Sequence, residues 1–412
     1  MKVYQTSEIR NIVLIGGTKT GKTTLAEAMV FEGGIISRRG TVDDKNTVSD
    51  YRPIELERQA SVSASLLYTL YNDKKINILD APGFDDFIGE VIGGLRVADT
   101  AVMVVNAQNG VEVGTEITWR WAARADEPIL FVINQLDLEH ANYDETMRNL
   151  KARFGNNVTT IQYPVNAGLG FNSFIDLLKM KMYKYPAGGG KPEICDIPAD
   201  EKDKAEEMQS ALIEELASKD EKLMEEFFDK GTLTEEQINK AMKIGMISRS
   251  MFPVLCVCSK QNMGVGRLLE FIAGAVPAPN EMPGAKTTEG KLLNFKASDP
   301  TALFIFKTSI EAHIGEISFF KVYSGEIVEA QDMINPSRNH TKERISQLFV
   351  VNGKNREKVE KFMPGDLGAT IKLKNVHTGN TLNSIKNPDD IIEATSYPEP
   401  KFRVAVLSLI HI

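Results

Sequence analysis

The segment GGTKTGKTT at residues 16–24 constrains the fold of this chain more than any other feature. It follows an apolar run at residues 12–15 and leads into TLAEAMVFE, which favours a helix. A glycine-rich turn between a strand and a helix wraps phosphate groups with its backbone N–H groups. In this pattern Lys22 neutralises the phosphate oxygens and Thr23 offers a hydroxyl to Mg²⁺. We therefore predict a nucleotide-binding loop made of Gly16, Gly17, Thr18, Lys19, Thr20, Gly21, Lys22, Thr23 and Thr24.

Length and composition limit the class of protein. A chain of 412 residues with 42% hydrophobic and 25% charged content is too long for one core, so two or three domains are expected. The net charge of −8 means that any nucleic-acid partner must be argued from a local site. The cysteines Cys195, Cys256 and Cys258 include no CxxC pair and are expected to be structural. No signal-peptide pattern and no apolar run of about 20 residues occurs, so we expect a cytoplasmic protein without a membrane segment.

Further buried-strand patterns alternate with helical ones in the first part of the chain. They lie at residues 76–79, 101–105, 129–133 and 254–257. This alternation predicts an α/β fold with a doubly wound, mostly parallel sheet that has helices on both faces. Its ligand is expected at the carboxyl ends of the strands.

A long stretch, residues 138–253, interrupts this alternation before the last strand. We expect an inserted α/β subdomain at about residues 155–253. Residues 204–230 carry apolar side chains at helical spacing against an acidic face, and Thr234 with Gln237 forms a capping-box pattern at the next helix. These helices are either a solvated surface pair or a face that docks a partner.

A segment rich in Pro, Gly and Thr follows residue 275 and is typical of a linker. We place a boundary there, with the nucleotide-binding domain at residues 1–284. From residue 303 onward short strand patterns alternate with turns, at LFIFKTSIE, EISFFKVYSGEIV, ERISQLFVV and LGATIKL. They predict a small antiparallel β-barrel domain at residues 285–394.

Two motifs after strands give the predicted loop its chemistry. DAPGF at 80–84 follows the strand at 76–79, where Asp80 is expected to support Mg²⁺ and the N–H of Gly83 to sense the γ-phosphate. NQLD at 134–137 follows the strand at 129–133, and the carboxylate of Asp137 can accept both the N1–H and the exocyclic amine of guanine. Asn134, Gln135 and Asp137 therefore predict GTP or GDP as the ligand. Between the loop and DAPGF, Ser61 is either an ordinary loop residue or a second hydroxyl for Mg²⁺.

These residues, in this order, resemble the translational GTPases, and elongation factor G most closely. The family's AHxDAGKTT, ERGIT, DTPGH and NKxD correspond here to GGTKTGKTT, ERQAS, DAPGF and NQLD. Its SAxxxxGV is similar to SKQNMGV at 259–265, so the resemblance implies that Ser259 and Lys260 also contact the nucleotide. GGLRVADTAVMVVNAQNGVE, DIPAD, KVYSGEI, GKNREKVEKFMPGDLGA and TGNTL carry the likeness from residue 10 to about 406.

The resemblance implies a factor that binds the ribosome with GTP and Mg²⁺ and drives movement of tRNA and mRNA. It also implies contact with rRNA and, through the acidic subdomain, with the ribosomal stalk protein. A monomer in solution is expected. The alternative is a ribosome-binding protection or recycling factor that uses GTP only as a structural ligand. A GTPase that acts away from the ribosome is poorly supported, because the second domain also matches.

Four positions depart from the family around the nucleotide. Phe84 replaces the histidine that positions the attacking water. Because a phenyl ring cannot orient water, we expect weakened hydrolysis. Phe84 is thus a degenerate catalytic position beside the expected catalytic residues Lys22 and Gly83. Lys19 replaces an aspartate, and it either supplies a positive charge in place of a monovalent cation or points to solvent. Gln135 lacks the lysine stem that packs on the base and the loop, and Ser61 lacks the methyl of threonine. These changes indicate a specialised, divergent paralogue.

The end of the chain departs from the family as well. Residues 395–406 resemble the start of a third domain, so we expect only the two N-terminal domains to be present. The last residues, 407–412, read LSLIHI, which matches the translation of a common sequencing adapter and is expected to be an artefact.

Overall fold

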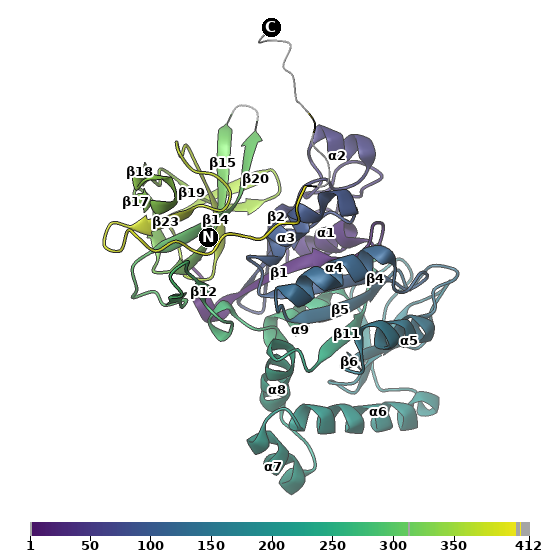
Figure 1. Cartoon of the computed structure of the whole chain (residues 1–412). Coiled ribbons are helices and arrows are strands. Elements are labelled where there is room, and N and C mark those ends of the chain that lie inside the picture. The colour runs from purple at the N-terminus through teal and green to yellow at the C-terminus, as the bar shows by residue number, and fades with distance from the viewer. Residues whose placement is uncertain (1, 312–313, 401–403, 405–412) are drawn as a thin grey trace.

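A parallel sheet organises the first part of the chain in the computed structural model, which describes residues 2–311, 314–400 and 404 (Figure 1). Its strands are β1 (Ile9–Ile15), β2 (Ser65–Tyr71), β3 (Lys74–Asp80), β4 (Thr100–Asn106), β5 (Ile129–Asn134), β6 (Val158–Thr160) and β11 (Phe252–Cys256). They lie in the order β2-β3-β1-β4-β5-β11-β6, and every pair is parallel except β2 with β3. The predicted α/β class and the predicted strands are confirmed.

Strand β2 is not predicted from the sequence, although the residues of the turn that follows it are typical of a hairpin. It forms a hairpin with β3 through Asn72 and Asp73, which both have positive φ, at 45° and 57°. Asn and Asp tolerate this left-handed conformation, which the tight turns of hairpins require.

Helices cover both faces of this sheet. They are α1 (Lys22–Glu32), α3 (Ile88–Leu95), α4 (Val113–Arg124), α5 (Tyr143–Phe154) and α9 (Val265–Ala275), with a short α2 (Pro53–Arg58) outside the sheet. Figure 1 shows α3, α4 and α5 in front of the strands and α1 and α9 behind them. Because both faces are covered, the strands are buried along nearly their whole length, as a continuous apolar run predicts.

The insertion forms a small sheet and a group of helices. Its elements are β7 (Gln162–Pro164), β8 (Ser173–Asp176), β9 (Lys181–Lys184), β10 (Glu193–Cys195), α6 (Ala199–Ala217), α7 (Glu221–Lys230) and α8 (Glu235–Ile247). The helical pattern at 204–230 is two helices rather than one, because the side chain of Asp220 accepts the N–H groups of Lys222 and Leu223 and starts α7. The capping box of Thr234 and Gln237 at α8 is confirmed.

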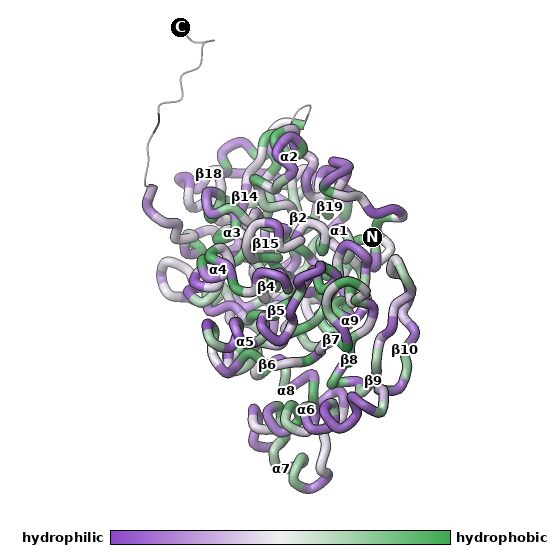
Figure 2. Tube along the Cα trace, turned by 90° about the vertical axis from the view of Figure 1, so that its right-hand side faces the viewer, coloured by the Kyte–Doolittle hydropathy of each residue, from purple (hydrophilic) through white to green (hydrophobic). Residues whose placement is uncertain are grey.

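The later part of the chain is an antiparallel sheet, which we call the β domain (residues 302–384). Its strands are β14 (Ala302–Glu311), β15 (Gly315–Ser324), β17 (Asp332–Asn335), β18 (Thr341–Arg344), β19 (Leu348–Asn352), β20 (Asn355–Val359), β22 (Leu367–Ile371) and β23 (Thr381–Ser384). They follow the order β18-β17-β23-β14-β15-β22-β19-β20 around a core that includes Leu303, Phe320 and Phe362. Figures 1 and 2 both place this domain and helices α6 and α7 at opposite ends of the molecule.

Short elements complete the chain. Two pairs of strands lie outside the larger sheets, β12 (Ala285–Lys286) with β13 (Leu292–Leu293) and β16 (Ile327–Val328) with β21 (Lys361–Phe362). The 3₁₀ turns are η1 (Thr6–Glu8), η2 (Asp85–Phe87), η3 (Pro279–Glu281) and η4 (Pro336–Arg338). Residues 407–412 (LSLIHI), which we expect to be an artefact, lie outside the described residues, as does most of 401–406.

Buried charges join the β domain to the parallel sheet. Lys75 of β3 donates to both carboxylate oxygens of Asp366, at 2.8 and 2.9 Å, and Lys321 of β15 donates to Asp99 at 2.7 Å. Asn11 of β1 links to Asp99 by its side-chain amide, at 2.6 Å. Each of these five side chains is buried, so the two domains share a buried polar network.

Candidate functional site

The loop between β1 and α1 has the geometry of an anion site. Lys22 begins the helix, and its ammonium donates to the carbonyls of Gly16 at 3.1 Å and Gly17 at 2.7 Å. Burial lowers the pKa of Lys22 to about 8. The N-terminus of α1 adds its free N–H groups and the positive end of its dipole, so the loop can bind phosphate.

Gly83 packs directly on this loop. A Cβ at this position would lie 2.5 Å from Nζ of Lys22 and 2.9 Å from the carbonyl oxygen of Gly17. A side chain would clash there, so the backbone of the DAPGF segment lies directly against the loop.

Two hydroxyls and two carboxylates converge beside Lys22. Thr23 Oγ1 and Ser61 Oγ are 3.1 Å apart, although 38 residues separate them in the chain. Both carboxylate oxygens of Asp80 are buried next to the hydroxyls of Thr23 and Ser49, and Oδ1 of Asp50 is buried near the hydroxyl of Ser61. Burial raises the pKa of Asp80 to about 6, and burial together with the charge of Asp80 raises the pKa of Asp50 to about 7. A divalent cation would offset this repulsion, and hydroxyl and carboxylate oxygens are the ligands that Mg²⁺ prefers.

Asp50 is a site residue that the sequence prediction did not include. It lies in an irregular stretch before α2, where one acidic residue among many gives no signal of its own. Only the folded chain brings it next to Asp80.

The opposite end of the loop meets the segments expected to bind the base. Asn134 donates to the carbonyl of Thr20 at 2.9 Å and to the hydroxyl of Ser259 at 3.0 Å, and its own oxygen accepts the N–H of Ser259 at 3.0 Å. The fully buried Asn134 therefore links the loop to the segment that begins at Ser259. Gln135 also reaches the loop, because its amide donates to the carbonyl of Lys19 at 3.1 Å. From the sequence we expected Gln135 to lose the contact that a lysine makes with the loop, but its shorter side chain keeps one.

Asp137 is held by neighbours that the sequence prediction missed. Gln261 donates to its Oδ2 at 3.0 Å. Burial and the nearby charge of Asp137 raise the pKa of the Cys258 thiol to about 12, so the thiol stays protonated beside the carboxylate. Arg39 donates to the carbonyls of Ser259 and Lys260, both at 2.9 Å, and so fixes the backbone of this segment.

A cavity of about 260 Å³ lies beside the loop and extends to Gln135, whereas Asp137, Ser259 and Lys260 are not among the residues that line it. It is lined by the predicted residues Thr18, Lys19, Gly21, Lys22, Thr23, Thr24, Ser61, Gly83, Phe84 and Gln135, and by Val42, Asp50, Arg58, Gln59 and Ala60. Phe84 keeps 42% of its surface exposed at the cavity, and Lys19 is exposed as well. Exposure of Lys19 favours the solvent-facing alternative for this side chain.

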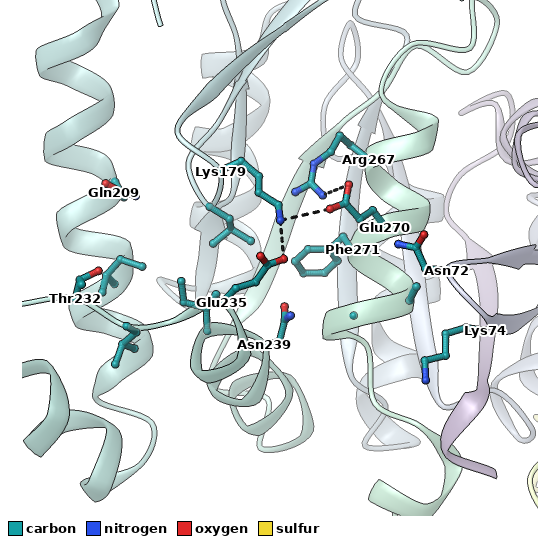
Figure 3. Close-up of a pocket in the computed structure, with 16 residues that line it drawn as sticks. Asn72, Lys74, Lys179, Gln209, Thr232, Glu235, Asn239, Arg267, Glu270 and Phe271 are labelled. Carbon is teal, nitrogen blue, oxygen red and sulfur yellow. Dashed lines mark hydrogen bonds and ion pairs between the residues drawn. The ribbon is translucent and has the colours of Figure 1, made fainter. Parts of the chain in front are cut away.

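A second, larger cavity of about 390 Å³ lies between the inserted helices and α9, away from the loop (Figure 3). The ammonium of Lys179 is 2.6 Å from Glu235 and 3.5 Å from Glu270, and the guanidinium of Arg267 is 2.8 Å from Glu270. Through Lys179 these ion pairs connect α8 of the insertion with α9, which packs on the parallel sheet. We interpret them as contacts that hold the insertion in place.

A glycine-rich loop at a helix N-terminus, two hydroxyls beside buried carboxylates and the carboxylate of Asp137 lie at the carboxyl ends of parallel strands. This arrangement is typical of the P-loop nucleotide-binding proteins of the GTPase class. Residues 7–278 match the family described as "Elongation factor Tu GTP binding domain", and residues 300–385 match "Elongation factor G domain 2". The chain belongs to the translational GTPases of the elongation factor G type.

Individual relatives agree with this assignment. The chain is 32% identical over 406 residues to Elongation factor G 1 of Syntrophomonas wolfei subsp. wolfei, which covers 97% of this chain and 60% of that protein. A crystal structure of a protein from Thermus thermophilus superposes with a TM-score of 0.85 at 27% identity, covering 96% of this chain and 57% of that one. The chain thus spans about 60% of the length of the curated relative.

None of the helices in the described ranges is long and apolar enough to cross a membrane.

Proposed function

We propose that this chain binds GTP with Mg²⁺ and acts on the ribosome in the translocation of tRNA and mRNA. The observation that carries the proposal is the approach of Ser61 to Thr23, 3.1 Å between hydroxyl oxygens, beside the buried carboxylate of Asp80. Thr23 and Ser61, with Asp80 behind them, would hold Mg²⁺, which supplies charge neutralisation of the phosphates when bound.

Each remaining part of the site has a role in binding the nucleotide. The residues of the loop from Gly16 to Thr24 cradle the phosphates, with Lys22 as the cation among them. Asn134 holds the loop against the base segments, and Asp137 reads guanine through its two carboxylate oxygens. Gln135, Ser259 and Lys260 are proposed to contact the nucleotide at the base end.

Hydrolysis is proposed to be slow. Phe84 occupies the position next to Gly83 at the edge of the cavity, and its ring offers no conventional hydrogen-bonding group to a water molecule. The chain would then hold GTP for longer on the ribosome than a factor with a polar side chain at this position.

The exposed Phe84 also favours a second candidate, a protection or recycling factor for which GTP is a structural ligand. Both candidates have the ribosome as partner, through rRNA and the stalk protein, and both are proposed to be monomeric in the cytoplasm.

Nucleotide binding and turnover by this protein, measured with and without ribosomes, test the proposal. We expect GTP and GDP to bind in preference to ATP, and phosphate release to be stimulated by ribosomes over many turnovers. Binding of GTP without repeated turnover would support the second candidate. Failure to prefer guanine nucleotides would contradict both.

A further inference from the structure

One lysine of the β domain, Lys307, contacts the nucleotide-binding domain at residues 63–64, just after Ser61. Lys307 lies on β14, and its side chain is only 14% exposed. Its ammonium donates to the carbonyl of Ala64 at 2.6 Å, to the carboxylate of Glu90 at 2.7 Å, and to the hydroxyl of Ser63. More than 240 residues separate Lys307 from Ser63 and Ala64 in the chain, so only tertiary folding creates these contacts.

The backbone just after Ser61 depends on these charged side chains. Glu90 of α3 accepts the N–H of Ala64 at 2.6 Å and the hydroxyl of Ser63 at 3.0 Å. Lys307 compensates the charge of this carboxylate and binds the same two residues from the other domain. Residues 63–64, which begin two residues after Ser61, are therefore held by side chains from both domains.

The same face of β14 also contacts residues 51 and 52, which precede Ser61 in the chain. Ser309 accepts a hydrogen bond from Arg52 at 3.3 Å, and Glu311 accepts one from Tyr51 at 3.1 Å. Residues 307, 309 and 311 alternate along the strand, so all three side chains point to one face, which here is the face toward residues 51–64. Lys307 is the member of this row that binds nearest to Ser61.

We infer that Lys307 is a positioning residue for the cation site: it holds residues 63–64 so that the hydroxyl of Ser61 stays beside Thr23. The inference rests on the proposed function, because it concerns the same Mg²⁺ and GTP site. The segment is held by contacts to Mg²⁺ and the γ-phosphate in GTPases, and these contacts exist only in the triphosphate complex. Lys307 therefore affects binding of GTP with Mg²⁺ and leaves binding of GDP unchanged.

The test uses the chain with Lys307→Met, and Lys361→Met as a control, because Lys361 pairs with Glu326 inside the β domain and away from the site. Dissociation of fluorescent GTP and GDP analogues is measured across a Mg²⁺ titration. Loss of charged hydrogen bonds that hold a segment is expected to raise the Mg²⁺ concentration for half-maximal GTP retention by about five- to tenfold in Lys307→Met. Binding of GDP and the control should match the wild type.

Three further variants separate positioning from a general structural role. Lys307→Arg is expected to restore part of the GTP effect, and Glu90→Gln to shift the Mg²⁺ requirement in the same direction as Lys307→Met. The double variant Ser61→Ala with Lys307→Met should be no worse than Ser61→Ala alone, because both act through one hydroxyl.

Three outcomes would overturn the inference while leaving the proposed function intact. They are wild-type nucleotide retention by Lys307→Met, equal losses of GTP and GDP binding in that variant, and additive effects on the Mg²⁺ requirement in the double variant. If Lys307→Met does not fold, as judged by its thermal unfolding, Glu90→Gln decides by the same criteria. If the wild type itself binds no GTP with Mg²⁺, the proposed function fails and the inference falls with it.

Discussion

The side-chain amide of Gln261 donates a hydrogen bond to Oδ2 of Asp137, with 3.0 Å between the two atoms. Each oxygen of a carboxylate has two acceptor positions, so this bond leaves room for guanine and fixes the rotation of the carboxylate. We expect Gln261→Ala to lower the preference for GTP over ITP, which lacks the exocyclic amine, by about three- to tenfold. Competition binding with the two nucleotides measures this, and an unchanged ratio would show that Gln261 does not orient Asp137.

Asp137 itself is predicted to set the choice of base. Asp137→Asn replaces a paired acceptor by an amide, so binding of GTP should weaken by about a hundredfold or more, through loss of two charge-assisted hydrogen bonds. Xanthine carries a carbonyl where guanine has its amine, and the new amide can donate to it. Binding of XTP should therefore improve relative to GTP in the variant. Equal GTP affinity in both proteins would remove Asp137 from the base site.

Phe84 is predicted to limit hydrolysis. Phe84→His introduces a group that can donate and accept hydrogen bonds at the exposed edge of the cavity, so single-turnover hydrolysis with ribosomes should rise about tenfold or more. Phe84→Leu is the matched control, since it changes shape without adding a polar atom, and it should stay slow. Equally fast hydrolysis in the wild type and in Phe84→His would refute weakened chemistry.

Glu127 is predicted to make stability depend on pH. Its side chain is buried with one carboxylate oxygen lacking a hydrogen bond, and burial, together with the charge of Asp99, raises its pKa well above the ordinary value. A pKa that is higher in the folded state contributes stability at low pH, and this contribution is lost as the pH rises through the folded-state pKa.

Glu127→Gln should therefore stabilise the protein at pH 8 by about 1–3 kcal/mol and change little at pH 4. Thermal unfolding at both values measures the difference, with the exposed Glu139→Gln as a control that should have no effect. A variant that is less stable at pH 8 would show that the charged form of Glu127 is favoured in the fold.

Lys75 is predicted to be essential for docking the β domain. Its ammonium and the carboxylate of Asp366 are buried together, and Lys75→Met would leave that carboxylate without its countercharge. The expected loss of unfolding free energy is about 3–5 kcal/mol. The surface pair of Lys358 and Glu329 offers the control, because Lys358→Met should cost at most about 1 kcal/mol. Urea unfolding compares the two, and equal small effects would contradict the prediction.

The sequence by itself determined five of the seven strands of the parallel sheet and the order of the motifs. The apolar runs predicted β1, β3, β4, β5 and β11, because parallel strands covered on both faces are continuously apolar. The loop at 16–24, with DAPGF and NQLD, predicted the nucleotide site because each motif follows a strand whose carboxyl end lies at the same edge of the sheet. The resemblance to elongation factor G is confirmed by the family matches over both domains.

Only the tertiary structure decided which distant side chains complete the site. Asp50 beside Asp80, Gln261 on Asp137 and Lys307 behind Ser61 come from irregular segments or from another domain, where local periodicity carries no information about partners. A charged residue in a loop has the same local signal whether it faces water or a buried carboxylate. Its pKa and its role follow from the charges and the burial that the fold brings to it.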